Sequence, residues 1–189
     1  PLGCALAGYA AVWLAMSTDV RLAAALAAGV VLWITTSVRM LAESGTRVIE
    51  ASDGNLETAR AALLALVGRE TAELSPGLIR SAAVESLAEN LSDGFLAPLL
   101  AFVLLSFVSL PAAAAGAAFV KGVNTMDSML GYPGPFGWAS ARLDDTVMFV
   151  PSRLSAVLLG LAAGDLDAPL RARQDAHTPA SPNAGWPIG

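Results

Sequence analysis

The sequence predicts an all-α, polytopic integral membrane protein that has a water-facing helical segment and irregular site loops rich in glycine and proline. Only 14% of its 189 residues are charged and 55% are hydrophobic, and the mean hydropathy is +0.60. Soluble domains usually carry about 25% charged residues. Three long stretches, 2–17, 22–38 and 94–120, contain no charged residue. We therefore expect a single membrane-embedded domain over 1–189, with the lipid bilayer as its surroundings.

The charge balance and the single cysteine argue against several other classes of protein. A net charge of −5 argues against nucleic acid as a partner, because a phosphate backbone requires a basic surface. Cys4 is the only cysteine, so neither an internal disulfide nor a cysteine-ligated metal is expected. No basic segment precedes the first apolar stretch, which argues against a signal peptide. The missing initial methionine and the abrupt end lead us to expect a piece of a longer protein.

The first 38 residues are expected to form two transmembrane helices joined by a tight turn. The first apolar run, Leu2–Met16, is shorter than the about 20 residues that a span needs, whereas Leu22–Val38 is closer to that length. Asp19 lies between them and can cap the second helix. Trp13 and Trp33 lie toward the ends of the two runs, where interfacial tryptophans are common. The alternative is a buried helical hairpin in a soluble bundle.

Residues 39–93 differ from the apolar stretches, because charged residues recur every few positions. We expect three amphipathic, water-facing helices here, over 39–51, over 56–67 and from Pro76 onward. Ser75 is suited to the N-cap of the third helix, and Pro76 to its first position.

The third of these helices carries residues suited to chemistry. Glu85 and Glu89 are four residues apart and share a helix face, and Asn90 and Asp93 follow. Like charges at this spacing need a cation, a metal or water around them. Mg²⁺ bound through one or two carboxylates and substrate phosphates suits such a face. The alternative is a solvated acidic face.

The apolar segment 94–120 is predicted to be either spanning or re-entrant. One straight span would place residues 85–93 and 124–145 on opposite sides of the membrane. Pro98 and Pro111 are expected to break the segment. We favour a helical pair that enters the membrane and returns, which is allowed where protein covers the backbone.

A polar site loop is expected over 121–145, because Gly131, Gly134 and Gly137 alternate there with two prolines. Its charged and amide side chains indicate a polar ligand, whereas the alternative is a solvated connection. These side chains are Lys121, Asn124, Asp127, Arg142, Asp144 and Asp145. A helix over 146–163 and an irregular, proline-containing tail over 164–189 complete the prediction. His177 in the tail is more typical of a structural than of a catalytic histidine.

Six blocks of sequence occur in order along the chain, namely VGRETAEL (67–74), AAVESLAENLSDGFLAP (82–98), NTMDSMLGY (124–132), FGWASARLDD (136–145), PSR (151–153) and SPNAGWP (181–187). Taken together, they resemble the CobD/CbiB family, the adenosylcobinamide-phosphate synthases of cobalamin biosynthesis. The resemblance covers the chain from about Arg39 to its end. Met126 stands where the family usually has leucine. The segment 148–153 keeps the family's usual proline and arginine, but it lacks the asparagine that usually begins the segment and the alanine that usually stands between the proline and the arginine.

The resemblance implies a multi-pass protein of the cell membrane that has its active site on the cytoplasmic side. It implies ATP-dependent amide ligation of (R)-1-aminopropan-2-ol phosphate, or aminopropanol, to the free propionate carboxylate of adenosylcobyric acid. ATP and Mg²⁺ are the expected cofactors, the corrinoid and the amino-alcohol phosphate are the expected partners, and an oligomer is compatible with this picture. The alternatives are a non-catalytic AmpE-like membrane sensor and a polytopic transporter or corrinoid-binding scaffold.

Candidate site residues follow from these blocks and from the chemistry of their side chains. The catalytic candidates are Glu85, Glu89, Asp127, Asp144 and Asp145. The candidates for substrate and phosphate binding are Arg69, Asn90, Lys121, Asn124, Ser128, Arg142, Arg153 and Asn183. The candidates for metal binding are Asp93, Asp127 and Asp145.

Overall fold

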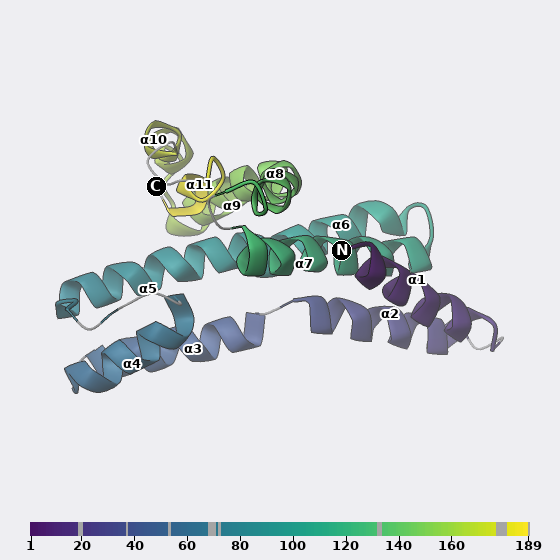
Figure 1. Ribbon diagram of the computed structural model, residues 1–189, viewed down its shortest axis with the longest axis horizontal. Helices are drawn as coiled ribbons and strands as arrows, with labels where there is room; N and C mark the ends of the chain where they lie inside the picture. Colours follow the sequence, from purple (N-terminus) through teal and green to yellow (C-terminus); the bar gives the residue numbers. More distant parts are fainter. Residues whose placement is uncertain are drawn as a thin grey trace.

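A computed structural model describes residues 1–18, 21–36, 38–52, 54–67, 71, 73–131, 134–176 and 181–188, and within these ranges every regular element is a helix. Three rows of helices run beside one another (Figure 1). The central row is the long stretch α5 (Pro76–Leu91), η1 (Ser92–Leu96) and α6 (Ala97–Ser106), which α7 (Leu110–Leu130) accompanies. One flanking row contains α1, α2, α3 and α4, and the other contains α8 to α11. The bounds of the flanking helices are α1 Leu2–Met16, α2 Arg21–Thr35, α3 Val38–Ser52, α4 Leu56–Val67, α8 Trp138–Val147, α9 Phe149–Ala163, α10 Ala168–Asp175 and α11 Gly185–Ile188.

An apolar bundle is formed where α1 and α2 pack on α7. Val12, Val31 and Ala114 are buried together at its centre, with Ala28 and Ala118 beside them. Small residues allow helices to approach closely in membrane proteins. The helices approach closely at Gly8, because a Cβ atom at that position would lie 3.0 Å from the Ala114 carbonyl oxygen and 3.2 Å from the Ala118 Cβ.

Replacing Gly8 by Leu is therefore expected to push α1 away from α7 and to lower the stability of the bundle by about 1–3 kcal/mol, as overpacking usually does. The matched control is Gly3→Leu on the same helix, because no atom lies within 4 Å of a Cβ at Gly3. Thermal unfolding in detergent measures the difference. Equal melting temperatures for the two variants would show that the close contact at Gly8 does not contribute to the stability of the bundle.

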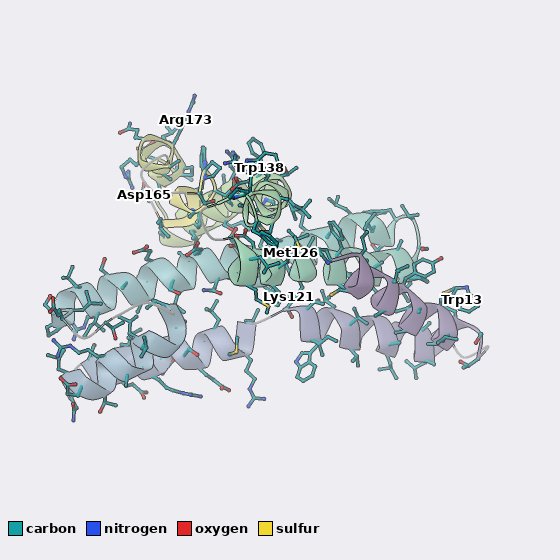
Figure 2. The ribbon with its side chains drawn as sticks, in the orientation of Figure 1. Trp13, Lys121, Met126, Trp138, Asp165 and Arg173 are labelled. Atoms are coloured by element: carbon teal, nitrogen blue, oxygen red, sulfur yellow. The ribbon has the colours of Figure 1, made fainter. Side chains whose placement is uncertain are left out.

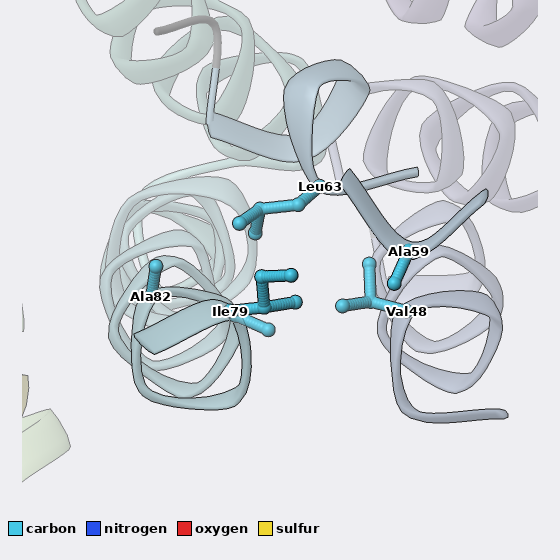
Figure 3. Packing of buried hydrophobic residues seen from close by; sticks show 6 residues of the cluster. Val48, Ala59, Leu63, Ile79 and Ala82 are labelled. Carbon is cyan, nitrogen blue, oxygen red and sulfur yellow. The ribbon is translucent and has the colours of Figure 1, made fainter. Parts of the chain in front are cut away.

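A second core joins α3, α4 and α5 at the other end of the molecule. Val48, Leu63 and Ile79 are fully buried and point toward one another, and Ala59 and Ala82 lie at the edges of the cluster (Figure 3). The outer face of α3 is charged, since Arg39 pairs with Glu43 at 2.8 Å in an exposed position. Apolar inner faces and charged outer faces agree with the amphipathic helices predicted for residues 39–93.

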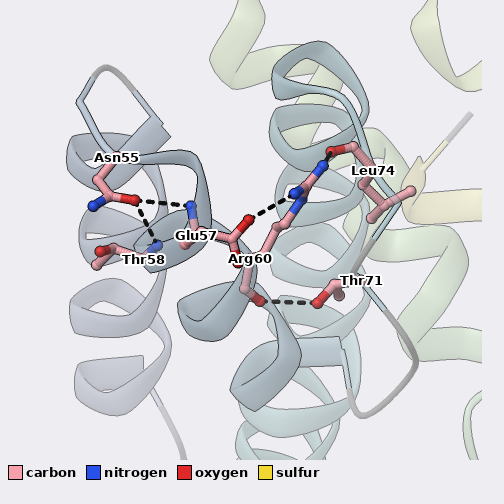
Figure 4. A network of polar contacts seen from close by, with 6 residues as sticks. All are labelled: Asn55, Glu57, Thr58, Arg60, Thr71 and Leu74. Carbon is pink, nitrogen blue, oxygen red and sulfur yellow. Dashed lines mark hydrogen bonds and ion pairs between the residues drawn. The ribbon is translucent and has the colours of Figure 1, made fainter.

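Polar contacts cap the start of α4 and tie its first half to the chain that leads into α5 (Figure 4). The Asn55 Oδ1 accepts hydrogen bonds from the backbone N–H groups of Glu57 and Thr58, at 2.9 and 3.3 Å, which caps the start of the helix. Arg60 donates from Nε and Nη2 to the Leu74 carbonyl, at 3.2 and 3.0 Å. These bonds hold the chain that leads into α5 against α4, and so they orient the helix that carries Glu85 and Glu89.

Several helices are long and apolar enough to cross a membrane. The stretches Leu22–Ser52 and Pro76–Ser106 meet this requirement, and the pair α8–α9, bent by 48°, adds a third if it is counted as one span. Exposed apolar side chains such as Trp33 (69% exposed) and Phe107 (85% exposed) lie along these helices and at their turns. The protein is thus a helical membrane protein. At 15 residues, α1 is shorter than a usual span, so its predicted crossing stays a prediction.

The apolar segment 94–120 folds as a helical hairpin, but its break is not at Pro98. The helix continues through Pro98 because a π-helical turn precedes it, in which the Ala97 N–H bonds to the Ser92 carbonyl five residues back. The chain reverses after Ser106, and Ser109 caps α7 through a bond from the Ala112 N–H to its Oγ, at 3.2 Å. Pro111 stands in the first turn of α7, where proline is tolerated. The hairpin returns the chain to the end of α5, and its depth in the membrane stays a prediction.

The site loop predicted over 121–145 is wrong in extent, because most of that stretch is helical. Residues 121–130 complete α7 and residues 138–145 belong to α8, so only 131–137 lie between helices. The glycines and prolines that break helices are concentrated in this short segment, whereas 121–130 contains a single glycine and no proline. The tail over 164–189 was likewise predicted to be irregular, but it contains α10 and α11. Proline fits in the first turn of a helix, and Pro169 occupies that place in α10.

Candidate active site

A polar cavity of about 570 Å³ opens between α5, α7, α8 and the tail. Its size is within the range of small-molecule sites, about 300–1,000 Å³. Most of the predicted site residues line it. These are Glu85, Glu89, Asn90, Asp93, Asn124, Asp127, Ser128, Arg142, Asp144, Asp145 and Asn183. The hairpin of α6 and α7 explains this convergence, because it brings the second half of α7 back beside the end of α5.

Helical periodicity places the side chains on the cavity wall. Glu85 and Glu89 face the cavity from one side of α5, whereas Asn124, Asp127 and Ser128 are three and four residues apart on α7. The Asn90 amide donates to the Ser86 carbonyl at 2.9 Å, so this side chain lies along its own helix. The result is a concave surface with an excess of carboxylates.

Two of these carboxylates have an oxygen without a hydrogen-bond partner. The Oδ1 atoms of Asp127 and Asp144 are both buried, and no described residue bonds to either. Buried polar atoms are almost always paired in proteins, and leaving a charged group unpaired is costly. Burial raises the pKa of the Asp127 carboxyl above its usual value, and the nearby carboxylate of Asp145 adds to the rise. A bound cation, either a metal ion or an ammonium group, would pair with the carboxylate oxygen and would lower the pKa of the carboxyl toward its usual value.

Asp145 differs from these two residues because both of its oxygens have partners. Its Oδ2 pairs with the Arg142 guanidinium at 3.2 Å, and its Oδ1 accepts a hydrogen bond from the Ser181 hydroxyl at 3.3 Å. The side chain of Asp145 is 17% exposed, whereas that of Arg142 is 61% exposed. Arg142 therefore reaches the mouth of the cavity, where it is placed to meet an anionic group of a ligand.

Two predicted site residues in the described ranges, Lys121 and Arg153, are not on the cavity wall. Lys121 lines a separate apolar groove between α1, α2 and α7, and it points away from α8 and α9 (Figure 2). Arg153 lies behind the cavity, where its guanidinium is 3.5 Å from the centre of the Phe149 ring. Arg69 lies outside the described residues, as does His177. The predicted phosphate contacts of Lys121, Arg153 and Arg69 stay predictions.

No group of three or more histidine, cysteine, aspartate or glutamate residues in the described ranges is arranged to hold a metal ion by itself. The predicted metal ligands Asp93, Asp127 and Asp145 all line the cavity, but they do not form such a group. Mg²⁺ is usually bound through one or two carboxylates together with water and substrate phosphates. The unpaired oxygen of Asp127 fits that mode of binding, so Mg²⁺ together with a nucleotide stays the prediction.

Two residues of the site were not predicted from the sequence. Ser181 bonds to Asp145 from a position 36 residues further along the chain, and Gly131 leaves room for the Asp127 carboxylate. Both lie inside the sequence blocks that resemble the CobD/CbiB family. Their place inside these blocks was the only signal in the sequence that could have pointed to the two residues. Their contacts depend on how the tail and the end of α7 fold back.

The fold and the cavity define a class of protein, a helical membrane protein with an acidic polar site. Comparison with known proteins identifies the family. The family model described as CobD/Cbib protein matches residues 1–189, and the chain belongs to this family. It is 40% identical over 171 residues to the cobalamin biosynthesis protein CobD of Rhodobacter capsulatus, which covers 84% of the chain and 50% of that protein.

Other relatives show a similar pattern. The chain is 42% identical over 159 residues to the cobalamin biosynthesis protein CobD of Klebsiella pneumoniae, over 79% of the chain and 48% of that protein. It is 40% identical over 143 residues to the cobalamin biosynthesis protein CbiB of Salmonella paratyphi A, over 71% of the chain and 43% of that protein. The chain thus spans about half the length of the curated relatives it matches. No solved structure matches it.

Proposed function

We propose that this chain carries the acidic site of an ATP-dependent carbon–nitrogen ligase of cobalamin biosynthesis. The reaction joins the amine of (R)-1-aminopropan-2-ol phosphate, or of aminopropanol, to the free propionate carboxylate of adenosylcobyric acid. Family membership supports the pathway, because the relatives are named cobalamin biosynthesis proteins. The observation that carries the reaction type is the cavity in which Asp127 and Asp144 each present a buried, unpaired carboxylate oxygen.

Amide formation from a carboxylate requires an activated acyl group. ATP transfers a phosphoryl or adenylyl group to the propionate oxygen, the amine nitrogen attacks the acyl carbon, and the C–N bond forms as phosphate or AMP leaves. Catalysis of such transfers consists mainly of positioning and charge neutralisation. When bound, Mg²⁺ would supply charge neutralisation of the phosphates.

The residues on the cavity wall divide these tasks by charge. Asp127 and Asp144 offer their unpaired oxygens to a cation, which is either the ammonium group of the amine or the metal that accompanies ATP. Arg142, held by Asp145 at 3.2 Å, is placed to bind a phosphate or the propionate. Glu85 and Glu89 on the opposite wall are suited to accept the proton that the attacking amine loses.

The direct test uses the full-length protein in detergent with adenosylcobyric acid, aminopropanol phosphate, ATP and Mg²⁺. Mass spectrometry should detect adenosylcobinamide phosphate, whose formation depends on ATP. The same mixture with aminopropanol identifies the preferred amine, and analysis of the nucleotide product distinguishes ADP from AMP. Binding of the corrinoid without any amide product would instead favour the non-catalytic alternatives, a membrane sensor or a scaffold.

The ligase proposal predicts that both walls of the cavity face the cytoplasm, because ATP is inside the cell. The test places single cysteines at the exposed positions Ser81 on α5 and Ala139 on α8, in a protein whose Cys4 and any other cysteine are replaced by serine. A membrane-impermeant maleimide should label both positions only after intact cells are permeabilised. Labelling of one of the two positions in intact cells would separate the walls across the membrane and contradict a shared site.

A further inference from the structure

The tail of the chain is joined to α8 and α9 by a set of contacts at one wall of the cavity. We infer that Arg153 and Asn183 are positioning residues that hold Asp145 on the cavity wall, and that neither is a ligand for substrate. We name the set Arg153, Ser181, Asn183 and Trp186, together with Asp145, the tail clamp. The inference deepens the proposed function, on which its kinetic test depends.

The Arg153 guanidinium is held by two aromatic rings and by hydrogen bonds from its Nη1 atom. Its guanidinium carbon is 3.5 Å from the centre of the Phe149 ring and 4.8 Å from the centre of the Trp186 ring. Its Nη1 donates to the Phe149 carbonyl at 2.5 Å and to the Asn183 Oδ1 at 3.1 Å. Arginine is the cation that stacks on aromatic rings and donates from a planar fork at the same time. Arg153 is therefore used in joining α9 to the tail.

Asn183 links Arg153 to Asp145 through two hydrogen bonds. It is 5% exposed, and both ends of its amide are occupied by protein groups. The Oδ1 accepts from Arg153, and the Nδ2 donates to the Asp145 carbonyl at 2.8 Å. The opposite orientation of the amide would set a donor against a guanidinium and an acceptor against a carbonyl, so this arrangement is the only one that satisfies both partners.

Ser181 completes the clamp on the side chain of Asp145. Its hydroxyl donates to the Asp145 Oδ1 at 3.3 Å and accepts from the Asn183 backbone N–H at 3.2 Å. The other carboxylate oxygen pairs with Arg142. Asp145 is thus fixed through its backbone by Asn183 and through its side chain by Ser181. Arg142 depends on Asp145 for its own position, so a loose tail would misplace the cationic group at the cavity mouth.

The kinetic test compares Arg153→Lys and Arg153→Ala in the full-length protein. A misplaced site group lowers kcat by about 100-fold, and we expect both variants to show such a loss without a rise in KM for ATP or for the amine. Lysine keeps the charge but does not reproduce the stacked fork, so it should not rescue the enzyme. The matched control is Arg173→Lys, because Arg173 points outward from α10 (Figure 2). Partial activity of Arg153→Lys with a raised KM for a phosphate-bearing substrate would overturn the inference.

A double-variant cycle tests whether the two residues act as one unit. Asn183→Ala should lower kcat by a similar factor, and Asn183→Ala combined with Arg153→Ala should be no worse than either change alone, because residues in one network are not additive. Losses that multiply in the double variant would show that the two residues act independently.

A spectroscopic test does not depend on catalysis. In a protein whose other tryptophans, including Trp13, Trp33 and Trp138, are replaced by phenylalanine, the emission of Trp186 reports on the clamp. Arg153→Ala and Asn183→Ala should shift this emission to longer wavelength, whereas Arg173→Lys should not. An unchanged emission would overturn the clamp even if the ligase reaction were found. A shifted emission in a protein that forms no amide would support the clamp and contradict only the proposed function.

Discussion

Replacing Asp127 by Asn is expected to abolish most of the amide-forming activity while the protein keeps its fold. The two side chains have the same shape, but asparagine lacks the negative charge that the buried Oδ1 now holds without a partner. If this oxygen binds a cation during the reaction, its loss should lower kcat by about 100-fold or more, as removal of one preorganised electrostatic contact does. Because an unpaired charge is removed from a buried position, the stability of the fold should stay the same or rise.

The ligase assay by mass spectrometry, with melting temperature recorded alongside, measures both effects. The dependence of the residual rate on Mg²⁺ and on the amine shows which cation Asp127 holds, because the half-saturating concentration of that cation should rise. The matched control is Asp167→Asn, which makes the same chemical change at an exposed position before α10. Near-normal turnover of the Asp127 variant would show that this carboxylate is only structural.

Local signals in the sequence were enough to predict several helices, because each begins or ends at residues that act on their immediate neighbours. The α4 helix spans the predicted 56–67, and α5 begins at Pro76 with Ser75 as its cap. The same local signals were misleading for 121–130. The polar residues Lys121, Asn124 and Asp127 resembled a loop, but they belong to a helix that α1 and α2 bury at Ala114 and Ala118.

The sequence was enough to predict which types of residue belong to the candidate site, but not how they are arranged in space. Glu85 and Glu89 were expected to share a face because of their spacing, and they do line the cavity together. The separation of Arg142 from Arg153 was not predictable, because it depends on contacts across 30 residues between α9 and the tail. Both are arginines in family-like blocks, yet one reaches the cavity mouth and the other contacts the rings of Phe149 and Trp186.

A glycine next to the site, Gly131, leaves no room for a side chain. Gly131 ends α7, and its backbone N–H bonds to the Asp127 carbonyl at 2.7 Å. A Cβ atom at Gly131 would lie 2.6 Å from that carbonyl oxygen and 2.8 Å from the Asp127 Cγ, and still closer to its Oδ1. Ordinary van der Waals contact between carbon atoms needs about 3.5 Å. The clash involves the backbone as well as the carboxylate, so a change of the Asp127 rotamer alone does not relieve it.

Gly131→Ala is therefore expected to move the Asp127 carboxylate off the cavity wall and to lower kcat by about 100-fold, as a shift of a site group by about 1 Å does. The matched control is Gly77→Ala in α5, where a Cβ meets open space. The loss should also depend on the carboxylate, so Gly131→Ala should cost little further activity in a protein that already carries Asp127→Asn. The assay is the ATP-dependent formation of the amide, followed for both single variants and the double variant. Full activity of Gly131→Ala would show that this glycine does not influence the site. The same conclusion would follow if Gly131→Ala lowered activity by an equal factor in the presence and absence of the Asp127 carboxylate.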